Sequence, residues 1–201
     1  MTLEDAINDL LISQVQSTRR LDSLGTYAAE RFRALGLTSI LGGNAAEITV
    51  SGIGRKKAWD IAFVLENKAR LIVSLKSILK NPSGSVPNRL DDLMGEAANV
   101  QNLTPEIVIG YIVVIDEAQD TRRKEDKIMW SDFFASRLKS ISIRKSPLWN
   151  QGIIEGSWLI KIDSRKPNGS RVSNLPRTIR EGDDFFQALI AELGVREPTL
   201  R

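Results

Sequence analysis

An aspartate and a lysine interrupt two neighbouring segments that otherwise have the composition of buried β-strands. Asp60 stands inside the apolar run 58–63, and Lys76 ends the apolar run 71–76. Strands so rich in isoleucine, valine, leucine and phenylalanine are expected to be buried. A buried charge is unfavourable unless it is paired, hydrogen-bonded or bound to a metal ion. These two residues are therefore the first candidates for a functional site.

A hairpin between the two strands places the polar residues together. Side chains alternate across a strand, so Trp59 and every second residue through 65 share one face, with Asp60 on the other. In the second strand, Ser74 and Lys76 lie opposite the bulky residues. Matching the bulky faces requires a turn of odd length within 66–70, and this register sets Asp60 beside Ser74 or Lys76.

A second carboxylate is expected from the following helix, which the sequence predicts from Asn88 to about residue 101. Glu96 lies at the margin of its apolar stripe, where it can reach a sheet edge, whereas Asp92 falls nearly opposite the stripe. Two carboxylates can hold Mg²⁺, and a lysine beside the ion stabilises negative charge in a transition state. Asp60, Lys76 and Glu96 thus have the chemistry of phosphodiester hydrolysis.

Composition removes several competing chemistries. The chain has 201 residues with no histidine and no cysteine, which excludes disulfides, thiol catalysis, Ser-His hydrolases and histidine-ligated metals. The net charge is +3, with short clusters of arginine and lysine that are compatible with nucleic-acid binding. Neither a membrane-spanning run nor a signal peptide is apparent, so a soluble cytoplasmic protein is expected.

Helices and buried strands alternate along the chain, which predicts a single α/β domain over residues 1–201 with a mixed central β-sheet flanked by helices. The segments 81–87 and 168–177 are expected to be loops. Helices are expected near 3–15, 23–35, 88–101, 131–141 and 183–193, and strands near 47–50, 58–63, 71–76, 107–115 and 152–162.

The arrangement of these residues resembles the PD-(D/E)xK nuclease superfamily, in particular the type II restriction endonucleases. In that family one strand carries an aspartate and the next carries (D/E)-x-K. Here Asp60 is followed by Ser74-Leu75-Lys76, so a serine replaces the central acid. A subgroup of restriction enzymes shares this S-x-K pattern and relocates the glutamate to the following helix, where Glu96 stands here. The resemblance covers about residues 25 to 115.

The resemblance implies a restriction-endonuclease-like core and Mg²⁺-dependent, sequence-specific cleavage of double-stranded DNA in the cytoplasm of a prokaryote. It implies a homodimer, because two strands of a symmetric site are cut by two active sites related by a two-fold axis. Asp60, Glu96 and the Leu75 carbonyl are the expected metal ligands. Lys76 is expected to position or activate the attacking water, with Ser74 as a small neighbour.

The later half of the chain is expected to supply DNA recognition and the dimer interface, with arginines that can contact guanine in pairs of hydrogen bonds. The residues expected to contact DNA are Arg55, Lys56, Lys57, Asn88, Arg89, Arg171 and Arg177.

Several alternatives remain open at this level. The segment 51–58 (SGIGRKKA) resembles the turn of a helix-hairpin-helix module, which would make the chain a DNA-binding protein. Other members of the nuclease superfamily act in DNA repair or processing, and an inactive nuclease fold can serve for binding. Asp92, Glu47 or Glu30 could complete the metal site in place of Glu96.

Overall fold

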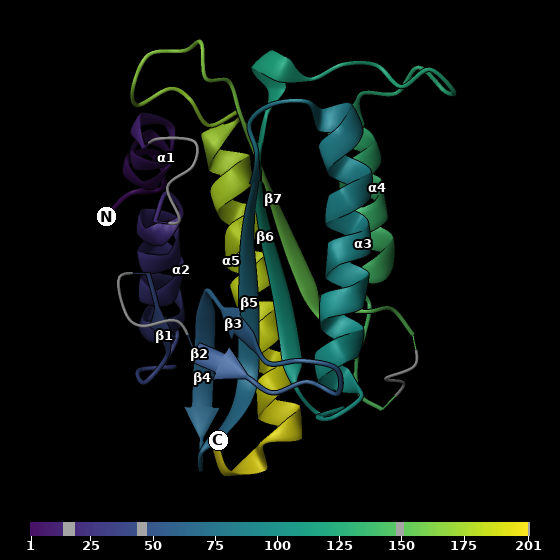
Figure 1. Ribbon diagram of the computed structural model, residues 1–201. Helices are drawn as coiled ribbons and strands as arrows, with labels where there is room; N and C mark the ends of the chain where they lie inside the picture. The colour runs from purple at the N-terminus through teal and green to yellow at the C-terminus, as the bar shows by residue number, and fades with distance from the viewer. Residues whose placement is uncertain (14–18, 44–47, 148–150, 201) are drawn as a thin grey trace.

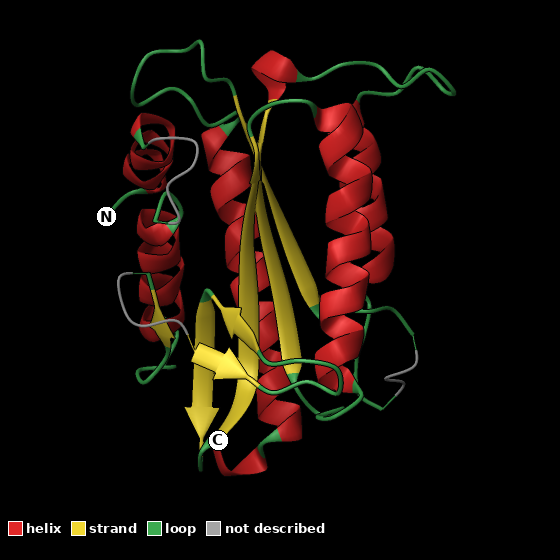
Figure 2. Cartoon of the chain, in the orientation of Figure 1, coloured by secondary structure: helices red, strands yellow, loops and turns green. Residues whose placement is uncertain are grey.

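The computed structural model describes residues 1–13, 19–43, 48–147 and 151–200. These residues form an α/β domain with a mixed five-stranded sheet between two layers of helices, as the sequence predicts (Figures 1 and 2). The strand order is β1-β4-β5-β6-β7; β4 is antiparallel to β1 and β5, and β5, β6 and β7 are parallel. The strands are β1 (Leu41–Gly42), β4 (Ile61–Leu65), β5 (Lys68–Ile78), β6 (Val108–Asp116) and β7 (Gly156–Ile162).

Each face of the sheet has its own hydrophobic core. One core packs under α1 (Leu3–Ile12), α2 (Asp22–Ala34) and α5 (Leu175–Arg196), and the other under α3 (Pro82–Gln101) and α4 (Trp130–Ile141). A small antiparallel sheet of β2 (Ile48–Val50) and β3 (Lys57–Trp59) joins the α3 side. Short 3-10 helices are η1 (Glu117–Gln119) and η2 (Pro198–Leu200). Within the described residues, no helix combines the length and the apolar character that crossing a membrane requires.

The interior strand β6, between β5 and β7, explains why the sheet must be covered on both faces. All nine of its residues are buried: the apolar run from Val108 to Ile115, as its sequence predicts, and Asp116 at its end. Gly110 allows α5 to approach closely, because a Cβ there would meet the Leu189 side chain at 2.6 Å. The helix layer and the sheet are therefore in direct contact at the centre of the domain.

The β4–β5 hairpin sets the register on which the candidate site depends. Its turn is formed by Glu66 and Asn67, both with positive φ, a backbone typical of two-residue hairpin turns. The pairing then shifts by one residue: Val64 pairs with Ala69, but Phe63 pairs with Leu71. The extra residue at position 70 is a β-bulge. With this extra residue, an odd number of residues separates the paired positions Phe63 and Leu71, as is required for the bulky side chains of both strands to lie on one face.

Two helices begin earlier than the sequence predicts. Asn81, not Asn88, caps α3, which starts at Pro82 and continues through Pro87. Pro82 fits the first position of a helix because its missing N–H has no partner there, and the helix continues through Pro87 in its interior. The segment 82–87 is therefore helix rather than loop. Asn174 caps α5 in the same way before Pro176, so α5 begins inside the predicted polar loop and continues past Gly194. The fourth helix begins at Trp130, one residue before Ser131.

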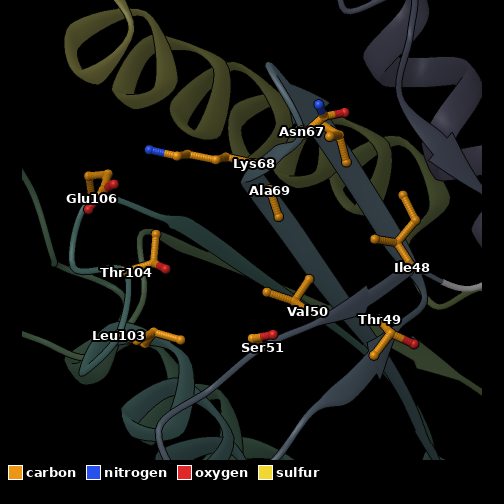
Figure 3. Close-up of a pocket in the computed structure, with 11 residues that line it drawn as sticks. Ile48, Thr49, Val50, Ser51, Asn67, Lys68, Ala69, Leu103, Thr104 and Glu106 are labelled. Carbon is orange, nitrogen blue, oxygen red and sulfur yellow. The ribbon is translucent and has the colours of Figure 1, made fainter.

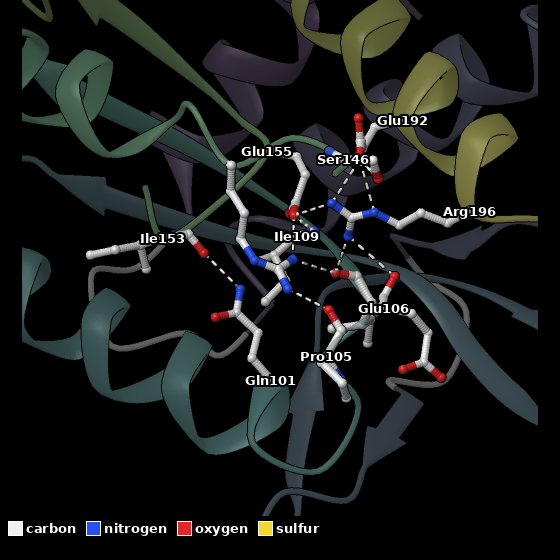
Figure 4. A network of polar contacts seen from close by, with 11 residues as sticks. Gln101, Pro105, Glu106, Ile109, Ser146, Ile153, Glu155, Glu192 and Arg196 are labelled. Atoms are coloured by element: carbon white, nitrogen blue, oxygen red, sulfur yellow. Dashed lines mark hydrogen bonds and ion pairs between the residues drawn. The ribbon is translucent and has the colours of Figure 1, made fainter. Parts of the chain in front are cut away.

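A buried ionic network ties the end of α5 to the start of β6 (Figure 4). Glu155 pairs with both Arg144 and Arg196, and its second oxygen accepts a 2.6 Å hydrogen bond from the Ile109 N–H. Arg196 also donates to the Ile107 carbonyl at 2.8 Å. The Glu155 and Arg196 side chains are each only 1% exposed. Each charge is thus compensated by several partners, as a buried network requires.

Glu155→Ala should lower the free energy of unfolding by about 3 kcal/mol or more, because it leaves two buried guanidinium groups without their shared carboxylate. Urea denaturation followed by circular dichroism measures the change. The control is Glu181→Ala, which removes an exposed i,i+4 partner of Arg177 and should cost less than about 1 kcal/mol. Equal losses in the two variants would show that the network contributes no more than a surface pair.

Candidate active site

Asp60 lies at the bend where the chain leaves the small sheet and enters the main one. Its Oδ2 accepts a 2.8 Å hydrogen bond from the Leu75 backbone N–H, which fixes the carboxylate against β5. The prediction that Asp60 lies within one continuous strand is therefore wrong. Trp59 is also not on the Ile61 face: it belongs to β3 and packs into the core under α3.

The register of β4 and β5 puts their bulky side chains on one face, as predicted. Ile61 pairs with Val73, so the next step along the hairpin sets Asp60 opposite Ser74. Ser74 pairs in turn with Tyr111 of β6, whose ring lies in the core under α3. Lys76 is two residues further along β5 and therefore projects from the same face as Ser74. Asp60, Ser74 and Lys76 thus line one face of the sheet beneath α3.

Glu96 approaches this face from α3 and is held there by an ion pair with Lys57. The exposed fraction is 11% for the Glu96 side chain and 17% for that of Lys57. The Lys57 ammonium also lies 4.8 Å from the centroid of the Trp59 ring. The expected position of Glu96 at the margin of the buried face is confirmed, whereas Lys57 turns inward rather than outward to solvent.

Electrostatics link these groups into one cluster. Burial lowers the pKa of Lys57; the hydrogen bond with Glu96 opposes the shift, and the nearby charge of Lys76 adds to it. Burial raises the pKa of the Tyr111 hydroxyl, with Glu96 and Asp60 among the charges that act on it. Two lysines and two carboxylates therefore share one partly dehydrated space.

The donor set fits a hard divalent cation. Glu96 Oε2 is buried and has no hydrogen-bond partner among the described residues, so it is an unused acceptor. Within a strand the N–H and C=O of one residue point to the same side, so the Leu75 carbonyl faces the Asp60 side of β5. Across the described ranges, no group of three or more histidine, cysteine, aspartate or glutamate side chains gathers at one point. Mg²⁺ commonly uses one or two carboxylates and completes its shell with water and phosphate oxygens.

The other candidate acids are less suitable. Asp92 is on α3 but its side chain is 49% exposed, and it pairs with Arg89. Glu30 lies on α2, in the helix layer on the opposite side of the sheet, where it pairs with the N-terminus. Glu47 lies outside the described residues. Of the acids considered in the described structure, Glu96 is the one that enters the cluster with Asp60.

The expected DNA-contacting residues are distributed over both faces. Arg55 and Lys56 are exposed in the β2–β3 loop on the α3 side, and Asn88 and Arg89 lie on α3 itself. Two others lie on the opposite side of the sheet and are already engaged. Arg171 donates to Asn8 of α1 at 3.0 Å, and Arg177 pairs with Glu181 within α5.

The helix-hairpin-helix alternative does not match the structure. Such a module needs a helix on each side of its turn, but the segment 51–56 joins two strands, β2 and β3. The β-branched composition of Ile48-Thr49-Val50 is the sequence signal that favours the strand.

The sequence analysis identified neither Tyr111, which lies on the α3 side of the sheet, nor Arg20, whose partner Ser77 faces away from Lys76 along β5. Tyr111 has a buried hydroxyl without a hydrogen-bond partner in the described chain. Its signal is a polar side chain in the middle of a strand that is otherwise apolar from Val108 to Ile115. Arg20 precedes α2, and its Nη2 donates to Ser77 of β5 at 2.5 Å. This contact depends on tertiary packing alone, so no sequence pattern predicts it.

A separate pocket of about 510 Å³ lies between β2, the β4–β5 hairpin and the loop before β6 (Figure 3). Its lining includes Ile48, Val50 and Ala69, with Lys68 and Glu106 at its polar end. None of Asp60, Lys76 and Glu96 lines it. The candidate catalytic cluster is therefore distinct from this cavity.

Compared with known proteins, the sequence matches no family model and no curated protein. The candidate site must therefore be judged on its own geometry.

Proposed function

We propose that the chain is a Mg²⁺-dependent endodeoxyribonuclease of the PD-(D/E)xK type, a type II restriction enzyme that acts as a homodimer on double-stranded DNA. The observation that supports the proposal most is the convergence of Asp60, Lys76 and Glu96 from three elements onto one face of the sheet. The cluster matches the residue types and order of the S-x-K restriction enzymes, with the second acid on the following helix.

Each residue has a distinct task in this proposal. Asp60, oriented by the Leu75 N–H, and Glu96 hold the ion, together with the Leu75 carbonyl. When bound there, Mg²⁺ would polarise the scissile phosphate and lower the pKa of the attacking water. Lys76 stabilises the negative charge that develops on the phosphate. Ser74 serves as a small neighbour rather than a nucleophile, because the chain has no histidine to activate it.

Incubation of the purified full chain with bacteriophage DNA and Mg²⁺ tests the proposal. We expect discrete fragments with Mg²⁺, no cleavage in EDTA, and loss of cleavage in Asp60→Asn, which keeps the shape of the side chain but removes its charge. The fold of the variant is checked by its thermal melting.

Other outcomes would contradict the proposal in different ways. A continuous smear of products would indicate a nonspecific nuclease of the kind that acts in repair or processing. A gel shift without cleavage would indicate a binding protein. Cleavage in EDTA, or by Asp60→Asn at the wild-type rate, would exclude the metal centre described above.

A further inference from the structure

Lys57 differs from its two basic neighbours in the direction of its side chain. Arg55 and Lys56 are exposed, whereas the Lys57 side chain is only 17% exposed and pairs with Glu96. Along β3 the side chains alternate, so Lys57 and the buried Trp59 share the inner face. The Trp59 ring adds a cation–π contact to the ammonium at 4.8 Å. A lysine held by both a carboxylate and an aromatic ring has a defined position.

The loop before β3 is clamped to α3 one turn beyond Glu96. Asn99 Oδ1 accepts hydrogen bonds from the N–H groups of Gly54 and Arg55 at 2.8 and 3.2 Å, and its amide donates to the Arg55 carbonyl at 2.9 Å. Gly52 permits this contact, because a Cβ there would lie 2.1 Å from the Asn99 amide nitrogen. The clamp therefore sets the backbone of Lys57 at a fixed distance from Glu96.

The charges around Lys57 determine how this lysine affects metal binding at Glu96. Lys57 lies close enough to Lys76, Glu96 and Asp60 for all three charges to act on it. Its ammonium is on Glu96 Oε1, while Oε2 has no hydrogen-bond partner within the described structure. If a divalent ion bound the Glu96 carboxylate, it would lie close to the Lys57 ammonium. These two positive charges would repel each other strongly in a space with little water.

We propose that Lys57 is the resident counter-ion of Glu96, and that a divalent cation binds this site only by displacing the Lys57 ammonium. The inference rests on the function proposed above. Lys57 is a positioning residue: it holds the Glu96 carboxylate in place before the ion arrives and competes with the ion for it. The clamp at Asn99 keeps the displaced ammonium within the site, where it can neutralise a phosphate oxygen of the substrate.

Calorimetric titration of Mg²⁺, and separately of Ca²⁺, into the full chain without DNA tests the competition. Lys57→Met should bind the ion about tenfold more tightly than the wild type, because the buried carboxylate has lost its competing partner. Lys57→Arg, which keeps a cation at the site, should stay near the wild-type affinity. The matched control is Lys68→Met, which removes an exposed lysine at the far end of β5 and should leave the affinity unchanged.

Thermal melting supplies a second readout that does not depend on the heat of ion binding. In EDTA, Lys57→Met should melt below the wild type, because Glu96 is left buried without a cation. Added Mg²⁺ or Ca²⁺ should raise its melting temperature more than that of the wild type. The inference would be overturned if Lys57→Met bound the ion no more tightly than the wild type and gained no more stability from it.

The same titrations separate the two proposals. If the wild type binds the ion and Asp60→Asn does not, the metal centre stands, and an unchanged affinity in Lys57→Met rejects the role of Lys57 alone. If neither the wild type nor Lys57→Met binds a divalent ion, both the metal centre and the counter-ion role are rejected.

Discussion

DNA cleavage should fall by roughly 10²- to 10³-fold or more when Lys76 is replaced by alanine, while DNA affinity stays close to that of the wild type. The lysine projects from β5 beside Ser74, on the face that carries Asp60. Its charge is most useful when negative charge develops on the phosphate, so its loss should lower the rate of the chemical step rather than binding. Single-turnover cleavage and a gel shift in Ca²⁺ measure the two quantities separately.

The control for this variant is Lys80→Ala, which removes an exposed lysine just beyond the end of β5. It should cleave at nearly the wild-type rate. Lys76→Ala must also melt cooperatively near the wild-type temperature, because a half-buried lysine can contribute to packing through its methylene groups. A folded Lys76→Ala protein that cleaves at the wild-type rate would place the catalytic cation elsewhere.

The sheet and the face shared by the polar residues could be predicted because they depend on period-two alternation. Bulky residues of β4 and β5 must face one core, and this requirement determines which side Asp60, Ser74 and Lys76 occupy. How the chain achieves the register was not predictable. The tight turn alone would pair the strands one residue out of step, and the bulge at position 70 corrects it.

The helix starts at residues 82 and 175 show where local composition misleads. Asparagine, proline, serine and glycine are typical of loops, but asparagine before proline also forms the start of a helix. Asn81 and Asn174 both adopt a left-handed backbone and accept a hydrogen bond from the first turn. The same residue types occur in loops and at helix starts, and which of the two forms depends on how the apolar stripe that follows packs.

The inward direction of the Lys57 side chain shows what could not be predicted about the candidate site from the sequence. Three consecutive basic residues at 55–57 suggest an exposed surface, and two of them are exposed. The third faces inward because β3 pairs with β2 and its alternation buries Lys57 with Trp59. This outcome depends on the pairing of a strand with only three residues, too short for its faces to be read from periodicity.

Glu96→Ala should be nearly inactive, because it removes one of the two carboxylates that the cluster offers to a divalent ion. Asp92→Ala is the matched control: it removes an acid four residues earlier on α3 that is half-exposed and paired with Arg89. It should retain most of the wild-type rate. If instead Glu96→Ala is active and Asp92→Ala is not, the second ligand has been assigned to the wrong acid of α3.

The double variant Ser74→Glu/Glu96→Ala tests whether the acid has been relocated from the strand to the helix. A glutamate at position 74 would project from β5 on the face of Lys76 and opposite Asp60. Ser74 is buried and its hydroxyl has no hydrogen-bond partner in the described structure, so the longer side chain needs the space that Glu96 vacates. We expect partial recovery, to within roughly 10²-fold of the wild-type rate, because a ligand misplaced by about 1 Å is costly. Ser74→Glu alone should be impaired, since it adds a second buried carboxylate beside Glu96. An inactive double variant that folds and still binds DNA would leave Glu96 required but would reject its exchange with position 74.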